Sequence, residues 1–555
     1  MCGFTFRKSK HLIGKFGYLK HRGPDEQTYF TGDDYELEFS RLTITGKIEG
    51  EVPVSSANRE WLVAFNGEIY NFKSLIKHHN LPFTDSDTKV IANGLEKLGL
   101  NFFRELRGMY AGVAINRRTK ATYIFRDPLG EKPLFYSYLD DNLLIASEFT
   151  ALLKLLGRPL ELNPKALSDY FRFGYVEEPD SFDKSICSVV RGSVSEITHE
   201  YKLNQVMSLS GYNEIETSLS LPELLQVLNQ EVSFSTVPTG LALSAGIDST
   251  SLLYAMSKYR DAAFIPLIVN INKRGISTEA AKAMDASYQM KLEPYLVQGY
   301  NSLDLLKSLK ELSFINDQPH ADPSGLSYLS IFQDAKALGL KVVLLGHGPD
   351  ELFWGYPWFN SQLSAARSKV NSPNQGRKYW DTPGKSSRLL WSIGQKDSLF
   401  DPQFSTDHYL QSINPWEKYR AEIVHSYLSS NGLRQSDRLA MACGVEPRTP
   451  YADSRLYGWA QKNSTKSREA FDKKEFRSAV ELGPLETSRN RKKEGFQSPM
   501  GTWFQDSQIN DFVGDCLQII SRKGVDWRIK PKLKLLSPSE KYRIIMLGSW
   551  LAQFA

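Results

Sequence analysis

The stretch VPTGLALSAGIDSTSLLYAMSKY (237–259) most constrains what this chain can fold into. It reads as an apolar strand, a loop of small residues and then a helix. Two more apolar runs follow, AAFIPLIVNI (262–271) and LKVVLLGHGPDELF (340–353), with helical patterns between them. Continuous apolar strands that alternate with helices are typical of a parallel sheet covered on both faces. This part of the chain is therefore predicted to be α/β.

The first 160 residues follow a different pattern. Short strand-like runs at 36–44, 60–69, 110–118, 121–127 and 143–149 are separated by turn formers, and helix-like stretches occur near 72–79 and 87–98. This favours a β-rich α+β domain. Because 555 residues are too many for one core, we predict two domains, 1–205 and 206–555. Residues 164–235 are interpreted as the connection, and the chain beyond 360 as mostly helical around a polar interval at 368–388.

The composition limits where the protein is expected to be located and which kinds of molecule it is expected to bind. No apolar run reaches about 18 residues, so no membrane span is expected. The four cysteines show no metal-binding spacing, which predicts a reduced, cytoplasmic protein without disulfides. The 68 basic and 63 acidic residues are spread along the chain, so we expect no nucleic-acid partner. One dense basic cluster, SRNRKKEGF (488–496), could be simply a solvated loop.

A cysteine stands at position 2, directly behind the initiator methionine. It could be a small buried hydrophobic residue, as most cysteines are. Alternatively, removal of Met1 would leave a thiol and a free α-amine, whose ordinary pKa is about 7.7–8, on one residue. That pair could attack an amide carbonyl.

Polar residues downstream suit such an attack. Asn66 and the backbone N–H of Gly67, expected on a turn after a strand, could stabilise an oxyanion. Arg41 could hold a substrate carboxylate, and Glu68 and Asp87 an ammonium group. Each has an ordinary alternative, because Asn-Gly is a common hairpin turn and surface charges are usually solvated.

The loop LSAGIDS (243–249) suits a phosphate, because small residues let the backbone approach and the following helix N-terminus adds donors. Ser244 and Ser249 could add hydroxyl groups. Asp248, with Asp350 and Glu351 after the later strand, would meet at the carboxyl edge of the sheet. Asp248 and Asp350 are the predicted Mg²⁺ ligands.

Taken together, MCG, RGPD, FNGEIYN, SDT and RDPLGEKPLFY resemble the glutaminase domain of class-II amidotransferases in the glutamine-hydrolysing asparagine synthetase family. LSAGIDS, GHGPDELFWGY, GVEPRTPYAD and RKKEGFQSPMGTW resemble that family's ATP-dependent synthetase domain. The resemblance implies an N-terminal-nucleophile hydrolase sandwich with αββα layers, then a parallel-sheet domain of the ATP-pyrophosphatase type with a helical C-terminal part.

The resemblance also implies the reaction, the small-molecule partners and the site residues. Glutamine is hydrolysed to ammonia, and ATP with Mg²⁺ adenylates a carboxylate acceptor, by default L-aspartate giving L-asparagine, AMP and pyrophosphate. A homodimer is compatible with it. The implied catalytic residues are Cys2, Asn66, Gly67 and Lys493. The implied glutamine site is Arg41, Leu42, Asn66, Gly67, Glu68 and Asp87. The implied ATP site is Leu243, Ser244, Gly246, Asp248, Ser249, Val269, Leu345 and Gly346, and the acceptor site is His347, Asp350 and Glu351.

Two departures leave the acceptor open. Ala245 replaces the middle glycine of the family's SGG, and His347 stands where aspartate-using members have glutamate. The second change could reflect drift, or a different acceptor such as a uronic acid of a surface polysaccharide or a natural-product precursor. A synthetase fed by free ammonia and a non-enzymatic protein on the same fold are further alternatives. Intact Cys2, Asn66 and Asp87 argue against the first of these.

Overall fold

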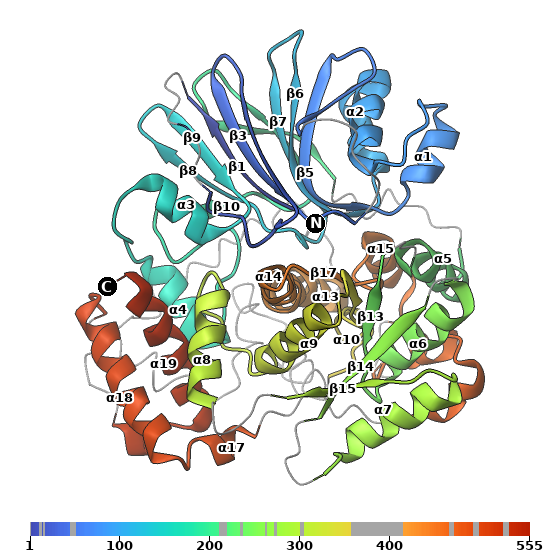
Figure 1. Cartoon of the computed structure of the whole chain (residues 1–555), viewed down its shortest axis with the longest axis vertical. Helices are drawn as coiled ribbons and strands as arrows, with labels where there is room; N and C mark the ends of the chain where they lie inside the picture. Colours follow the sequence, from blue (N-terminus) through green and yellow to red (C-terminus); the bar gives the residue numbers. More distant parts are fainter. Residues whose placement is uncertain are drawn as a thin grey trace.

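The computed structural model describes residues 2–9, 14, 17–44, 52–209, 219–233, 237–260, 263–270, 275–299, 305–356, 415–465, 471–491, 499–525 and 532–554. Lys493 and the polar interval 368–388 lie outside these residues. Figure 1 shows a strand-rich half, which carries the N-terminus, above a half in which helices surround a parallel sheet.

The N-terminal half contains two six-stranded sheets. Phe4, Phe6 and Phe39 of the first sheet pack against Leu62 and Val113 of the second in one apolar cluster. The first sheet has the order β10 (Cys187–Ser188), β8 (Phe135–Leu139), β9 (Asn142–Ala146), β1 (Cys2–Lys8), β3 (Tyr35–Arg41), β2 (Glu26–Thr31). The second has the order β12 (Leu203–Ser208), β11 (Ser193–Ile197), β7 (Thr122–Arg126), β6 (Gly108–Asn116), β5 (Trp61–Ile69), β4 (Val54–Ser55).

Helices cover the outside of this sandwich. Helices α1 (Phe72–His78) and α2 (Asp87–Leu98) lie beside the second sheet (Figure 1), where Val90, Ile91 and Leu95 join the apolar cluster of β5. Helix α3 (Phe149–Leu156) packs against β8 and β9 of the first sheet. The predicted αββα sandwich is thereby confirmed.

The segment 164–235 contributes more than a connection. It forms α4 (Pro164–Phe173), the three sandwich strands β10, β11 and β12, and α5 (Leu221–Ser233). The domain boundary predicted at 205–206 falls within β12, and it stays a prediction.

The C-terminal half is built on a five-stranded sheet in which every neighbouring pair is parallel. Its order is β15 (Tyr295–Gln298), β14 (Phe264–Asn270), β13 (Thr239–Ala242), β16 (Val342–Leu344), β17 (Glu446–Arg448). The three predicted strands are confirmed as β13, β14 and β16; β15 and β17 were not anticipated. One face packs with α5, α6 (Ile247–Tyr259) and α7 (Thr278–Gln289), and the other with α9 (Gly325–Ala337) and α14 (Arg434–Ala442).

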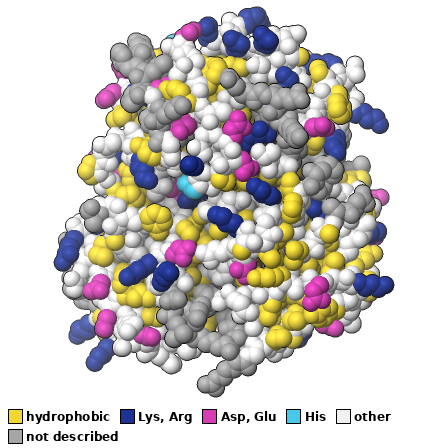
Figure 2. Space-filling view, viewed as in Figure 1, with side chains coloured by type: hydrophobic (Ala, Val, Ile, Leu, Met, Phe, Trp, Pro, Cys, Tyr) yellow, Lys and Arg dark blue, Asp and Glu magenta, His cyan; other side chains and the backbone are white. Residues whose placement is uncertain are grey.

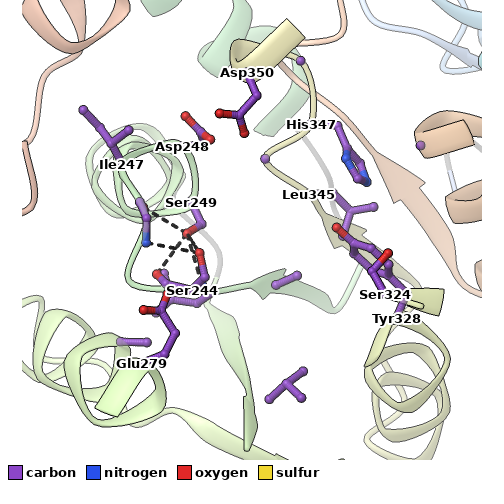
Figure 3. A pocket seen from close by; sticks show the side chains of 18 of the residues that line it. Ser244, Ile247, Asp248, Ser249, Glu279, Ser324, Tyr328, Leu345, His347 and Asp350 are labelled. Carbon is purple, nitrogen blue, oxygen red and sulfur yellow. Dashed lines mark hydrogen bonds between the residues drawn. The ribbon is translucent and has the colours of Figure 1, made fainter. Parts of the chain in front are cut away.

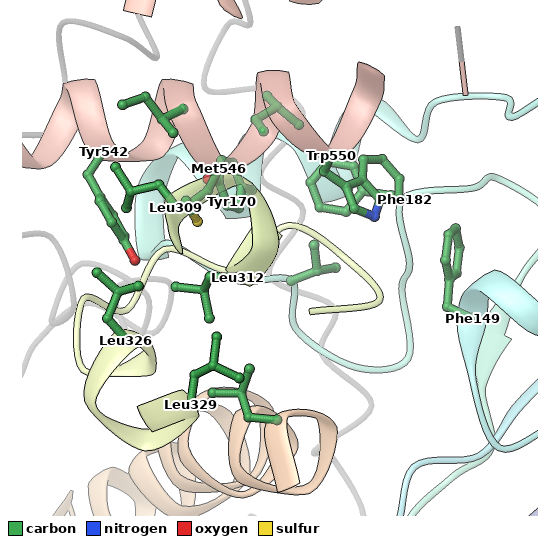
Figure 4. Packing of buried hydrophobic residues seen from close by; sticks show 14 of the residues in the cluster. Phe149, Tyr170, Phe182, Leu309, Leu312, Leu326, Leu329, Tyr542, Met546 and Trp550 are labelled. Atoms are coloured by element: carbon green, nitrogen blue, oxygen red, sulfur yellow. The ribbon is translucent and has the colours of Figure 1, made fainter. Parts of the chain in front are cut away.

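One apolar cluster joins the two halves (Figure 4). Leu309 and Leu312 of α8 (Leu305–Ile315) contribute to it, together with Met546 and Trp550 of α19 (Pro538–Leu551). Phe149, Tyr170 and Phe182 add side chains from the N-terminal half, and the Tyr170 hydroxyl donates to the Arg543 carbonyl oxygen at 2.7 Å. This shared core holds the two halves in one arrangement. Within the described residues, no helix has both the length and the apolar character needed to cross a membrane.

Candidate active sites

The side chain of Cys2 opens onto a small cavity at the start of β1. Strand β1 lies between β3 and β9, and Cys2 is paired with Arg41. The cavity has a volume of about 40 Å³. The Cys2 backbone nitrogen donates to Asn66 Oδ1 at 3.1 Å. The predicted residues that line the cavity are Cys2, Arg41, Leu42, Gly67, Glu68 and Asp87.

Asn66 and Gly67 do not lie on a turn, and this part of the sequence prediction was wrong. Both lie inside β5, which continues its pairing with β6 so that Gly67 stands opposite Tyr110. Gly67 has a φ of +150°, and a Cβ atom there would lie 2.0 Å from the Met109 carbonyl oxygen. Only glycine fits this close approach of two strands without strain. The Asn-Gly pair therefore serves the sheet geometry beside Cys2 rather than chain reversal.

Asp87 closes the other side of the cavity as the first residue of α2. Ser86 caps this helix by accepting from the Lys89 N–H. The Asp87 carboxylate accepts from the backbone N–H groups of Ile69 (3.1 Å) and Thr88 (2.7 Å). Burial raises the pKa of Asp87 to about 6, although these two hydrogen bonds oppose the change. The site thus holds a buried carboxylate that takes up a proton more readily than an ordinary aspartate.

The other cavity residues are already held by neighbours. Arg41 Nη1 lies 3.5 Å from Glu26 Oε2, and Glu68 Oε2 lies 3.5 Å from Arg448 Nη2 of β17. Burial raises the pKa of the Cys2 thiol, an effect that the Leu42 N–H and Arg41 only partly oppose. A thiol in this setting needs a base before it can act as a nucleophile.

A much larger cavity, of about 890 Å³, opens at the carboxyl ends of β13, β14 and β16 (Figure 3). All of the predicted ATP and acceptor residues line it: Leu243, Ser244, Gly246, Asp248, Ser249, Val269, Leu345, Gly346, His347, Asp350 and Glu351. The structure therefore brings these predicted residues together. Lys493 lies outside the described residues.

The loop from Ser244 to Ser249 is tied by its own hydroxyl groups. The Ser244 and Ser249 Oγ atoms lie 2.9 Å apart, and the Gly246 N–H donates to Ser244 Oγ at 3.2 Å. Ala245 donates its N–H to Glu279 Oε1 at 2.8 Å. Its φ is not positive, so alanine is tolerated where the family pattern has glycine.

Asp248 and Asp350 both contact the ammonium group of Lys473, a residue that the sequence analysis does not predict for this site. Lys473 Nζ lies 2.7 Å from Asp248 Oδ2 and 2.9 Å from Asp350 Oδ1. The Lys473 side chain is only 2% exposed. Two carboxylates that meet at one cation also suit Mg²⁺, which takes few protein carboxylates plus phosphate oxygens. The sequence DKKEF (472–476) carried no signal that could distinguish Lys473 from its neighbours.

His347 lies on the wall opposite Ser244 and Glu279 (Figure 3). Its Nε2 is 2.9 Å from Ser436 Oγ, and its ring lies 5.5 Å from the ring of Tyr328. Ser436 Oγ itself donates to the Gly432 carbonyl oxygen. The hydroxyl proton is thereby used, so His347 donates through Nε2 in this arrangement. A neutral or cationic imidazole therefore occupies this wall.

Comparison with known proteins matches both halves. A glutamine amidotransferase domain model matches residues 1–206, and an asparagine synthase model matches residues 223–524. The chain belongs to the asparagine synthase family. This member of the family is a glutamine-dependent amidotransferase and a carbon–nitrogen ligase of the asparagine synthase type, and its family uses ATP.

Curated relatives resemble this asparagine synthase family member along most of its length. Glutamine-hydrolyzing asparagine synthetase 1 of Bacillus subtilis is 26% identical, covering 93% of this chain and 90% of the relative. Asparagine synthetase 2 of the same organism is 27% identical, covering 81% of this chain and 63% of the relative. A putative asparagine synthetase of Mycobacterium bovis is 25% identical, covering 89% and 85%.

Proposed function

We propose that this chain transfers the amide nitrogen of glutamine to a carboxylate that it first activates with ATP. The observation that supports this best is that one chain holds two complementary sites. One has a half-buried thiol beside Asn66 and Asp87, and the other has paired carboxylates beside a small-residue loop. We assign these sites to domains 1–205 and 206–555.

In the first site, Met1 removal would free the α-amine of Cys2 to take the thiol proton. Cys2 Sγ then attacks the side-chain carbonyl carbon of glutamine. The Asn66 side-chain N–H and the Gly67 backbone N–H face the developing oxyanion. Arg41, Leu42, Glu68 and Asp87 hold the amino-acid end. The C–N bond breaks, ammonia leaves with the proton from the α-amine, and water cleaves the thioester to give glutamate.

In the second site, ATP lies on the 243–249 loop, with Val269, Leu345 and Gly346 around it. Asp248 and Asp350 would hold Mg²⁺, which offsets phosphate charge when bound. An oxygen of the acceptor carboxylate attacks the α-phosphorus and pyrophosphate leaves, while Lys473 and Lys493 offset the charge that develops. Ammonia attacks the activated carbon, AMP leaves with its bridging oxygen, and the nitrogen loses one proton to give the neutral amide. Ammonia that stays inside the protein gains the advantage of a positioned reactant.

L-Aspartate is the first acceptor to test, because the relatives bear the name asparagine synthetase. A specific observation favours a second candidate, a uronic acid or another carboxylate. His347, which the resemblance pairs with a glutamate, lies in the cavity wall and donates to Ser436. A side chain there that carries no negative charge suits an acceptor whose charges are arranged differently from those of aspartate.

The test is AMP and pyrophosphate formation with glutamine, ATP, Mg²⁺ and a panel of carboxylic acids. Rapid turnover of aspartate would contradict the assignment of another carboxylate as the acceptor. Turnover of a uronic acid alone would contradict the assignment of aspartate. No AMP with any acid, from a protein that binds ATP, would contradict the ligase assignment.

Two further expectations have their own tests. Light scattering would test whether the protein is a homodimer, and cell fractionation would test whether it is cytoplasmic.

A further inference from the structure

Arg22 connects the nucleophile to the other half of the protein. Its guanidinium is completely buried, and its Nε donates to the Cys2 carbonyl oxygen at 3.2 Å. Its Nη2 donates to Asp437 Oδ2 at 2.8 Å. Strand β1 accommodates this side chain because residue 3 is glycine, where a Cβ would lie 2.8 Å from Arg22 Cδ. One side chain therefore touches both Cys2 and the ligase half.

Asp437 is held from the glutaminase side on both of its oxygens. Lys132 Nζ donates to Oδ1 at 3.1 Å, while Arg22 takes Oδ2. All three side chains are at most 2% exposed. Burial would raise the pKa of Asp437, but Arg22 and Lys132 hold it below the ordinary value. The carboxylate thus stays ionised between two cations that both come from the N-terminal half.

The helix that carries Asp437 also reaches the ligase cavity. Asp437 lies on α14 and directly follows Ser436, which accepts from His347. Gln435 of the same helix lines the large cavity. The strand that bears Cys2 and the wall that bears His347 are therefore supported by neighbouring residues of one helix.

We propose that Asp437, a residue of the ligase half, is a positioning residue for the thiol centre and acts through Arg22. Buried charge-assisted hydrogen bonds fix geometry well, and Arg22 lies between two carboxylates, since its Nη1 also donates to Glu148 Oε1 at 3.2 Å. Loss of the Asp437 charge would leave Glu148 as its one anion, so the guanidinium would shift toward Glu148, away from the Cys2 carbonyl oxygen, and misplace the nucleophile. The glutaminase centre is then complete only when the ligase half is docked on it. This inference rests on the proposed function of Cys2.

The test uses the full chain, with Met1 removal verified by mass spectrometry, and measures glutamine hydrolysis without ATP or acceptor. Asp437→Asn keeps the size and removes the charge. We expect kcat to fall about tenfold or more while KM for glutamine changes little, because the glutamine-holding residues are untouched. Asp437→Glu keeps the charge and should restore part of kcat, which a purely structural effect would not do.

Asp183→Asn is the matched control. Asp183 is also a buried carboxylate with a bidentate arginine partner, Arg158, at 2.7 and 3.0 Å, but it lines neither site. Its replacement should lower stability without changing the glutaminase kcat.

The outcomes separate the two proposals. An inactive wild-type chain would contradict the proposed function, whereas an active one with unchanged kcat in Asp437→Asn would overturn the role of Asp437. An equal fall of kcat in Asp183→Asn would also overturn it. If Asp437→Asn does not fold, Arg22→Lys decides, because lysine keeps the positive charge but has no Nε to donate to the Cys2 carbonyl oxygen: a kcat equal to that of wild type overturns the inference, and a fall of about tenfold with little change in KM supports it.

Discussion

Lys473 Nζ lies 2.7 Å from Asp248 Oδ2, although the two residues are separated by 225 positions in the sequence. The same ammonium reaches Asp350, so one buried cation holds the two carboxylates that we assign to Mg²⁺. Asp248 lies in the first turn of α6, and Asp350 lies on the short helix α10 (Pro349–Leu352). The contact therefore aligns two loops at the edge of the parallel sheet.

Replacement of Lys473 by methionine should slow the ATP-dependent step about a hundredfold, since removing one positioned charge typically costs about 2.7–4 kcal/mol. Pyrophosphate release under saturating substrates measures this, and glutamine hydrolysis should remain within twofold. Lys474→Met is the matched control, because Lys474 is the adjacent lysine and is exposed. Equal loss in both variants would show that the effect is not specific to position 473.

Replacement of Cys2 by alanine should abolish glutamine hydrolysis, by at least about a thousandfold, because no other group can form the thioester. Amidation supported by ammonium chloride should persist. Cys187→Ala serves as the control, since Cys187 is also a free, half-buried cysteine. Glutamate production that survives in Cys2→Ala would disprove the nucleophile assignment.

Replacement of Gly67 by alanine should destabilise the protein by about 1–3 kcal/mol, since the added methyl group meets the Met109 carbonyl oxygen and the backbone is strained. Glutaminase activity should fall as well, because the Gly67 N–H would move. Urea unfolding and initial rates measure the two effects. Gly501→Ala, which has no atom within 4 Å of the added Cβ, should lower neither stability nor activity.

The kcat/KM for glutamine should decline as the pH falls below about 6. Burial raises the pKa of Asp87 to about 6, so the carboxylate of the empty pocket becomes protonated there and loses its attraction for the substrate ammonium. Above that pH the Asp87 carboxylate is ionised and contributes no further change in kcat/KM. A profile from pH 5 to 8 measures this, with the ammonia-dependent reaction as the reference. An identical acid limb in both reactions would assign it to another group.

Local sequence determined most of the elements. The apolar runs predicted β13, β14 and β16, and the alternating runs predicted the sandwich strands, because burial imposes these patterns on neighbouring residues. The motifs also predicted residues that line two cavities, although Asn66 contacts the Cys2 backbone nitrogen without lining the cavity and Lys493 lies outside the described residues. Asn66 and Gly67 were placed wrongly on a turn, since the sequence does not show that β6 continues to pair alongside them.

Only the tertiary structure decided which charged residues, far apart in the sequence, contact one another. Arg22 and Asp437 are 415 positions apart, and neither Lys473 nor Asp437 stands out in the chain. Ion pairs of this kind depend on how two folded halves dock, and no local propensity encodes that. The local sequence motifs thus indicated the residues of the two sites. The packing of residues far apart in the sequence determined which buried charged side chains position those sites.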